Sequence, residues 1–405
     1  MHDGTAKGGS KASDVRFVDT DDGADTMVRE LANADEVAAD FEADGLFAYR
    51  AKLCLAQFAH AGVVWVVDTL AIDPKRLAPL TGPSGPIKII HDVTFDARLL
   101  TEAGLPLGNV KDTALAARML GRTATGLASL VLAEFGVTLS KELQHHDWRV
   151  RPITARQMGY LAADVVHLAP LAERLFGEAT AAGILEEVAC ETDHRIHESR
   201  SSAEEGETRP PYVRVKGIEK VPPVERAIVR GLAEIRETLA CEHDVPPHRV
   251  LSAETLLQIA RNRPGSPSLL SRIRGFGPND LATDLVDSVL EAVREGLAAG
   301  DVPADERHHF ERKRMDGALV RERKARESAL TTWRKSAASE RKVDPQVILP
   351  GHCLKEVVDR NPTSLDSLAE VAGIGAFRVA RYGAAILGVL AKAREGEPAP
   401  DGTPP

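Results

Sequence analysis

A long internal repeat constrains the fold of this 405-residue chain more than any other feature. Two segments match without a gap at a constant offset of 98 residues, which is the separation of Gly275 and Gly373. The first copy carries Leu232, Arg236, Val245, Pro247, Leu251, Leu256, Pro264, Ser266, Leu270, Gly275 and Gly277, and the same residue types recur at Leu330, Arg334, Val343, Pro345, Leu349, Leu354, Pro362, Ser364, Leu368, Gly373 and Gly375. Since an ungapped match of this length indicates a repeated structural unit, we expect two small helical domains of one fold.

The segment before the repeat has a different pattern, in which short apolar strands alternate with helical periodicities. Strands are predicted at 36–41, 53–59, 63–67 and 87–91, and helices at 94–103, 112–120, 127–135 and 154–178. Strands that feed helices in this order are typical of a layered α/β domain. A polar, proline-terminated stretch from Ser199 to Pro211 predicts a linker to the repeat.

The predicted domain boundaries follow these changes of pattern. They are a disordered segment at 1–27, the α/β domain at 28–198, a linker at 199–219, the first helical copy at 220–298, a basic connector at 299–319, the second copy at 320–392 and a disordered tail at 393–405. The two terminal segments are rich in Gly, Pro, Asp or Ser, and we expect them to lack the apolar surface that folding requires.

Acidic side chains recur in the α/β domain at spacings that would bring them together. Asp40 and Glu42 lie at the end of a strand, where a period of two puts both on one face. Tyr160 and Asp164 share a helix face at i, i+4. Asp96 lies near the start of a helix that follows a buried strand. Taken alone, an acid at this place is explained by its favourable interaction with the helix dipole. Together these residues predict one acidic cleft.

Such a cleft predicts divalent metal ions. Clustered carboxylates raise one another's pKa values unless cations neutralise them. Oxygen ligands without thiolates favour hard ions, which means Mg²⁺ or Mn²⁺. Two ions about 3.5–4 Å apart stabilise the attacking and leaving oxygens of a phosphoryl displacement. Because the ordinary pKa of tyrosine is about 10, we expect Tyr160 to be neutral and to orient the attacking water.

These residues carry a family resemblance. Residues 28–182 resemble the DEDDy branch of the DnaQ-like, RNase H-like 3′→5′ exonucleases, and specifically the ribonuclease D family. The similar motifs are Asp40-x-Glu42, Asp96 and Tyr160-x-x-x-Asp164, with supporting segments that begin at Asp112, Gly126 and Asp147. The resemblance implies that the first-motif acids and Asp164 bind the catalytic metal, with Asp40 bridging to a second ion that Asp96 supports. It also implies that Tyr160 positions the water and that nucleoside 5′-monophosphates are released one at a time.

The first motif departs from the usual Asp-Thr-Glu pattern, because Phe41 stands in place of the threonine. Since Phe41 lies between two inward acids on a strand, we expect its ring to point the other way, into the core. No catalytic position is missing, so we expect an active enzyme.

Both helical copies resemble HRDC domains, the modules shared by RecQ helicases and ribonuclease D. Gly275 and Gly277 in the first copy, and Gly373 and Gly375 in the second, form a Gly-x-Gly turn. Such a turn presents backbone amides at a helix N-terminus, where phosphate binds, so we predict nucleic-acid contacts at all four glycines. The alternative is that these glycines only cap and turn helices.

Further nucleic-acid contacts are predicted at Trp148, Arg151, Arg312, Lys313 and Arg314. The chain as a whole is acidic, with a formal net charge of −9, so positive charge that holds a polyanion must be local. The alternatives are that Trp148 packs in the core and that the basic run belongs to a solvated helix face with i, i+4 ion pairs.

Cysteine spacing and the N-terminal composition bear on location. The four cysteines are far apart and show no zinc or disulfide spacing, and the first residues lack an apolar signal segment. We therefore expect a cytoplasmic protein without a membrane segment, and a monomer.

The expected architecture is an α/β RNase H-like (DnaQ-like) exonuclease domain followed by two small all-α HRDC domains. The leading hypothesis is a metal-dependent 3′→5′ exoribonuclease that trims structured RNA precursors such as tRNA 3′ ends. One alternative is a Werner-type 3′→5′ exonuclease that acts on DNA. Another is a nucleic-acid-binding scaffold whose exonuclease fold is inert, against which the intact set of five site residues argues.

Overall fold

The computed structural model describes residues 14–205, 209–276, 282–310 and 316–395. The chain forms two compact units. One takes in residues 1–42, 53–201 and 315–405, and the other takes in residues 43–52 and 202–314. Across the described ranges, no helix combines the length and the apolar character that crossing a membrane would need.

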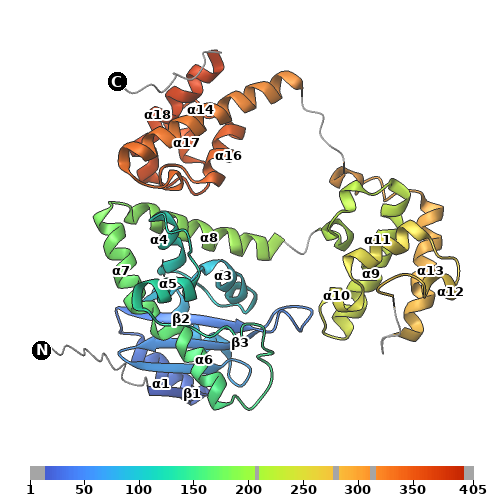
Figure 1. Cartoon of the computed structure of the whole chain (residues 1–405), viewed down its shortest axis with the longest axis horizontal. Helices are drawn as coiled ribbons and strands as arrows, with labels where there is room; N and C mark the ends of the chain where they lie inside the picture. Colours follow the sequence, from blue (N-terminus) through green and yellow to red (C-terminus); the bar gives the residue numbers. More distant parts are fainter. Residues whose placement is uncertain (1–13, 206–208, 277–281, 311–315, 396–405) are drawn as a thin grey trace, which may run out of the picture. The chain divides into compact units, whose positions relative to one another are not determined.

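The first unit contains a six-stranded sheet with the order β1-β4-β3-β2-β5-β6 (Figure 1). Its strands are β1 (Asp14–Val18), β2 (Glu36–Ala43), β3 (Leu53–His60), β4 (Val63–Asp68), β5 (Ile87–Ile90) and β6 (Val110–Asp112). The pairs β1–β4, β2–β5 and β5–β6 are parallel, whereas β3 and β4 are antiparallel. The strands predicted at 53–59 and 63–67 form a hairpin, which turns at Ala61 and Gly62, whose φ angles of 49° and 83° suit a two-residue hairpin turn.

Helices cover this sheet and complete the α/β domain. They are α1 (Asp21–Leu31), η1 (Pro74–Leu77), α2 (Ala78–Thr81), α3 (Val93–Glu102), α4 (Thr113–Met119), α5 (Leu127–Phe135), α6 (Ala155–Val166), α7 (Leu168–Ala181) and α8 (Leu185–Glu205). Helix α6 packs on β3 and β4, and α7 packs on β5 (Figure 1). Thr154 begins α6 with a capping box that it forms with Gln157. The α/β fold expected for this segment is confirmed.

Three expectations about the ends of elements are wrong. Residues 14–27 are not disordered, because β1 pairs with β4 and Thr20 caps α1; residues 1–13 lie outside the described part. The helix expected at 154–178 is two helices that meet at His167. The linker expected from Ser199 begins later, because α8 continues to Glu205 and still buries Ser199.

The two helical copies have the same order of elements. The first copy contains α9 (Pro223–Glu242), α10 (Pro247–Val250), α11 (Ala253–Asn262), α12 (Pro267–Leu270) and α13 (Ala282–Ala299), and the second contains α14 (Gly317–Arg341), α15 (Pro345–Ile348), α16 (Gly351–Arg360), α17 (Leu365–Ala369) and α18 (Ala376–Glu395). Short 3₁₀ turns flank the first copy at η2 (Pro211–Arg214), η3 (Ile218–Lys220) and η4 (Arg307–His309). The starts of α10 and α15, and of α11 and α16, are separated by the offset seen in the sequence, which confirms the repeat.

The second copy packs on α8 within the first unit. Arg341 donates to Glu187 over 2.8 Å, although Glu187 is only 1% exposed. His352 lies 3.0 Å from Glu191, and its ring stacks on that of His194 with 3.8 Å between the centroids. This contact is therefore polar and largely shielded from water.

Candidate active site

Three acidic side chains from two elements converge at one point of the α/β domain. Asp40 and Glu42 lie near the end of β2, and Asp164 lies in α6, which crosses the sheet. One carboxylate oxygen from each lies within 4.8 Å of the other two. Phe41 between them is 4% exposed and contacts Phe58 edge-on, so the prediction that its ring points into the core is confirmed. Strand alternation thus sends both acids of the motif to the same side.

The electrostatics of this group favour a bound cation. Burial, followed by the charge of Asp40, raises the pKa of Asp164 to about 7. Burial, followed by the charges of Asp40 and Asp164, raises the pKa of Glu42, and burial raises that of Asp40. Each carboxylate ionises more easily if a positive ion shares the site. Hard divalent ions fit this donor set, because the three ligands are all oxygens.

Asp96 lies beside this group without belonging to its tightest part. It is in the first turn of α3 and is 5% exposed. Burial, followed by the charges of Asp40, Asp112 and Glu42, holds the pKa of Asp96 well above its ordinary range. The structure therefore brings the fourth predicted acid within electrostatic reach of the other three.

Tyr160 and Trp148 lie next to each other beside the acidic group. Burial and the charge of Asp164 raise the pKa of the Tyr160 hydroxyl, so this group is neutral at neutral pH. The Trp148 ring lies 6.1 Å from the Tyr160 ring, and its indole N–H donates a hydrogen bond to the Glu42 carboxylate, which offsets a small part of the rise in the pKa of Glu42. A neutral hydroxyl at this place donates or accepts a hydrogen bond but does not act as a strong base.

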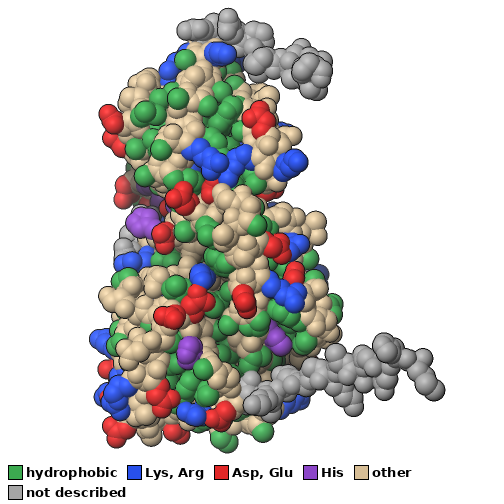
Figure 2. Space-filling model, turned by 90° about the vertical axis from the view of Figure 1, so that its left-hand side faces the viewer, with side chains coloured by type: hydrophobic (Ala, Val, Ile, Leu, Met, Phe, Trp, Pro, Cys, Tyr) green, Lys and Arg blue, Asp and Glu red, His purple; other side chains and the backbone are tan. Residues whose placement is uncertain are grey.

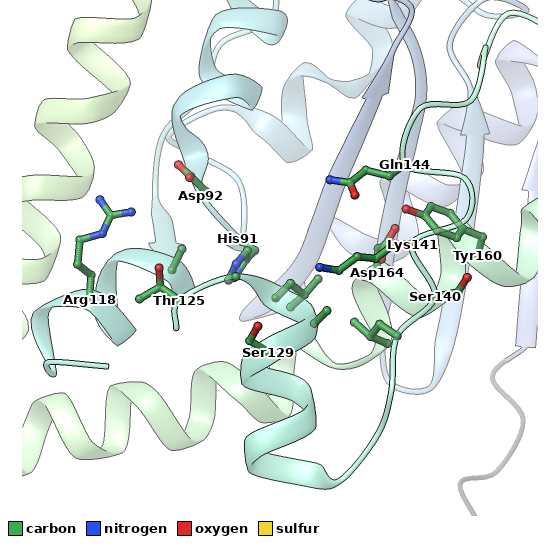
Figure 3. A pocket seen from close by; sticks show the side chains of 15 residues that line it. His91, Asp92, Arg118, Thr125, Ser129, Ser140, Lys141, Gln144, Tyr160 and Asp164 are labelled. Carbon is green, nitrogen blue, oxygen red and sulfur yellow. The ribbon is translucent and has the colours of Figure 1, made fainter. Parts of the chain in front are cut away.

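A cavity of about 370 Å³ opens beside the acids (Figure 3). Tyr160, Asp164, Lys141 and Gln144 lie on one side of it, and Arg118 and Asp92 lie on the other. Its remaining polar lining comes from His91, Thr125, Ser129 and Ser140. No sequence pattern pointed to Arg118 or Lys141, because these two residues reach the cavity from α4 and from the segment after α5 only once the chain has folded.

One predicted nucleic-acid contact is wrong, and the residue of another has a structural role. Trp148 is 1% exposed and lies in the core, so the packing alternative holds and its ring is closed to a base. The Arg151 guanidinium pairs with both carboxylate oxygens of Asp68, and it also donates to the carbonyls of Trp148 and Cys54. Arg151 therefore fastens the segment after Trp148 to β3 and β4.

The glycines of the second copy have a packing role. A Cβ atom at Gly373 would lie 2.7 Å from Nδ1 of His194, and one at Gly375 would lie 2.7 Å from Sγ of Cys190. Both neighbours belong to α8, so the absence of a side chain at these two glycines lets the turn pack closely on that helix, and nucleic-acid contact there stays a prediction. Gly275 in the first copy meets only its own domain, at Thr255, and nucleic-acid contact there stays a prediction. Gly277, Arg312, Lys313 and Arg314 lie outside the described residues.

Charge on the visible surface is mixed. Figure 2 shows Lys, Arg, Asp and Glu side chains interspersed over the face it displays. Arg323 in α14 donates to Asp359 and also pairs with Glu327 at i, i+4. These pairs are typical of a solvated helix face, and they do not test the alternative for Arg312, Lys313 and Arg314.

Comparisons with known proteins agree with this geometry. A family model described as a 3′-5′ exonuclease matches residues 15–178. A model of the HRDC domain matches residues 225–293 and 321–390, which confirms the identity of the two helical copies. An exonuclease domain of this kind depends on divalent metal, and the acidic group described above fits that requirement.

Similar proteins extend the agreement over most of the chain. A ribonuclease D of Gluconacetobacter diazotrophicus is 30% identical over 312 residues, which cover 74% of this chain and 73% of that protein. A ribonuclease D of Granulibacter bethesdensis is 28% identical over 285 residues, which cover 67% of this chain and 69% of that protein. The crystal structure of Escherichia coli RNase D, an exoribonuclease involved in structured RNA processing, superposes with a TM-score of 0.68 over 94% of this chain and 99% of that one, and at 23% identity it shows the shared fold. The chain belongs to the ribonuclease D family of 3′→5′ exonucleases.

Proposed function

We propose that this exonuclease removes nucleotides one at a time from the 3′ ends of structured RNA precursors, such as those of tRNA. The observation that carries the proposal is the group of three carboxylates within 4.8 Å of one another beside a polar cavity. RNA is favoured as the polymer because the similar proteins named above are ribonucleases D. The spacing of the cysteines supports a cytoplasmic enzyme, and we propose a monomer.

Asp40, Glu42 and Asp164 would hold one divalent ion, Mg²⁺ or Mn²⁺, and Asp40 with Asp96 would hold a second. When bound, two such ions stabilise the attacking and leaving oxygens of an in-line phosphoryl displacement. The protein's own groups supply the rest. The neutral Tyr160 hydroxyl orients the attacking water by a hydrogen bond, and the cavity beside it receives the terminal nucleotide.

Two cationic side chains support binding of the strand at this cavity. Arg118 and Lys141 both line it and are exposed. Within the described part of the chain, neither is held in an ion pair, so both are available to phosphate groups. A chain with an acidic total thus has positive charge next to the place where a polyanion must enter.

The test uses the full-length protein on two oligonucleotides of one sequence, RNA and DNA, each with a 3′ overhang. We expect Mg²⁺-dependent release of nucleoside 5′-monophosphates from RNA and slower release from DNA, because the 2′-hydroxyl distinguishes the two. Asp40→Asn should abolish release. Asp35→Asn, a change to an exposed acid just before β2, should leave it unchanged. Equal activity of Asp40→Asn and the unmodified protein would contradict the proposed site, and a preference for DNA would replace RNA as the substrate.

A further inference from the structure

The Asp112 side chain caps two helices at once. Its carboxylate is 1% exposed and ends β6. Oδ1 accepts the backbone N–H groups of Ala114 and Leu115, at 2.9 and 3.0 Å, in the first turn of α4. The same carboxylate also accepts two backbone N–H groups at the start of α3, from Asp92 to Oδ1 at 3.1 Å and from Val93 to Oδ2 at 3.0 Å. One side chain therefore satisfies four amides that helix ends leave without partners.

The start of helix α3 is capped by Asp112, a residue outside this helix. Asp92 occupies its N-cap position but makes no capping bond with its own side chain. Its backbone has φ 65°, in the left-handed region that few residues other than glycine adopt, asparagine and aspartate more often than most. A conformation of this kind persists where the surroundings hold it in place. At the start of α3, two hydrogen bonds to Asp112 do this.

The start of α3 decides where Asp96 lies. Asp96 is in the first turn of this helix, three residues after Val93. Burial around Asp96 leaves its carboxylate little freedom to compensate for a shift of the backbone. A displaced helix start would thus move Asp96 away from Asp40 without touching β2 or α6.

We infer that Asp112 is a positioning residue of the exonuclease site, which holds the start of α3 so that the Asp96 carboxylate faces Asp40. The inference rests on the proposed function, because Asp96 matters only if it helps to bind metal. Asp112 itself contacts amides and acts through Asp96. Groups that orient metal ligands in this indirect way typically change metal affinity or activity by about 10- to 100-fold when they are replaced.

Asp112→Asn separates this role from ordinary capping. Asparagine is as good an N-cap as aspartate, and its Oδ1 keeps the bonds to α4. Its amide nitrogen replaces Oδ2, so that a donor faces the Val93 N–H. The matched control is Asp316→Asn, which alters the cap of α14 at the Ala318 N–H, 2.9 Å away and in another domain.

The measurement is Mn²⁺ binding to the full-length protein without RNA, followed by the electron paramagnetic resonance signal of free Mn²⁺. We expect Asp112→Asn to weaken binding at the second ion about 10- to 100-fold and Asp316→Asn to leave it unchanged. In an Asp96→Asn background the same substitution should cause no further loss, because residues that act through one group are not additive. With RNA, kcat should fall while KM stays the same.

Two results would overturn the inference: unchanged Mn²⁺ binding in Asp112→Asn, or an equal further loss in the Asp96→Asn background. If Asp112→Asn does not fold, hydrogen exchange of the Asp92 and Val93 amides in the metal-free natural protein decides. Protected amides support the inference, and amides that exchange at unprotected rates refute it. Weakened Mn²⁺ binding in a protein that degrades no RNA would refute the proposed function and leave the role of Asp112 standing.

Discussion

The charge of Asp164 should destabilise the protein whenever metal is absent. Burial and the charge of Asp40 raise the pKa of this carboxyl from 3.8 to about 7. Between these two pH values the unfolded chain has lost a proton that the folded protein still holds. Stability falls with rising pH wherever the folded state binds more protons than the unfolded chain. Asp164 therefore leaves the free energy of unfolding unchanged below pH 3.8 and lowers it by the full amount above about pH 7.

The size of the effect follows from the two pKa values. One pKa unit corresponds to about 1.36 kcal/mol. The free energy of unfolding of the metal-free protein should therefore be lower by about 4 kcal/mol at pH 8, and by about 2 kcal/mol at pH 5.5, than if Asp164 were always neutral. Asp164→Asn makes the side chain neutral at every pH with almost no change of shape. The variant should be the more stable protein in the absence of metal, and its advantage should grow with pH.

Urea unfolding in the presence of a chelator measures this difference. Tryptophan fluorescence reports the first compact unit, because Trp65 and Trp148 lie in its exonuclease domain and Trp333 lies in α14. Saturating Mg²⁺ should stabilise the natural protein more than Asp164→Asn, because the ion binds the folded state through this carboxylate. The control is Asp366→Asn, a change to an exposed acid in α17 that should show no such pH dependence. The reasoning would be refuted if Asp164→Asn were no more stable than the natural protein at pH 8. It would also be refuted if the gain in stability over the natural protein were the same at pH 8 and at pH 5.5.

Two further predictions concern the contact between α8 and the second helical copy. Arg341→Met should lower the free energy of unfolding by about 3–5 kcal/mol, measured by urea unfolding, because it leaves Glu187 buried without its 2.8 Å partner. Arg381→Met, which removes a half-exposed partner 3.8 Å from the same acid, should cost no more than about 1 kcal/mol. Gly373→Ala should lower the melting temperature, because φ is +73° and the new Cβ would meet a histidine ring of α8 at 2.7 Å. Gly388→Ala, in the interior of α18 with open space around it, should instead stabilise by about 1 kcal/mol.

The acids of the site were predictable because their signals are local. Asp40 and Glu42 share a face through the two-residue period of β2, and Tyr160 and Asp164 share one through the turn of α6. Neither relation depends on the rest of the fold. Asp96 needed the order of motifs as well, since its distance from the others is set by how α3 begins.

The burial and the partners of the residues predicted to contact nucleic acid could not be read from local signals. Nothing near Arg151 in the sequence indicates an ion pair, because its partner Asp68 is 83 residues away, at the end of β4. Trp148 stands in a polar segment that resembles an exposed loop, although the ring is enclosed by the sheet and α6. The polar composition of residues 199–205 likewise suggested a linker, because a helix that buries only part of one face has little apolar periodicity to show.

The repeat shows why a repeated sequence need not mean a repeated function. The positions that recur between the copies are mainly core leucines and turn-forming glycines and prolines, which specify the fold. Some contacts of the second copy with the exonuclease domain come from recurring positions, such as Gly373 and Gly375, but others come from positions that do not recur. Val347, which joins a core cluster with residues of α4 and α7, corresponds to Arg249, and His352, which pairs with Glu191, corresponds to the exposed Glu254. The Gly-x-Gly turn of the second copy therefore has a packing role against α8 that the turn of the first copy does not share, and nucleic-acid contact at either turn stays a prediction.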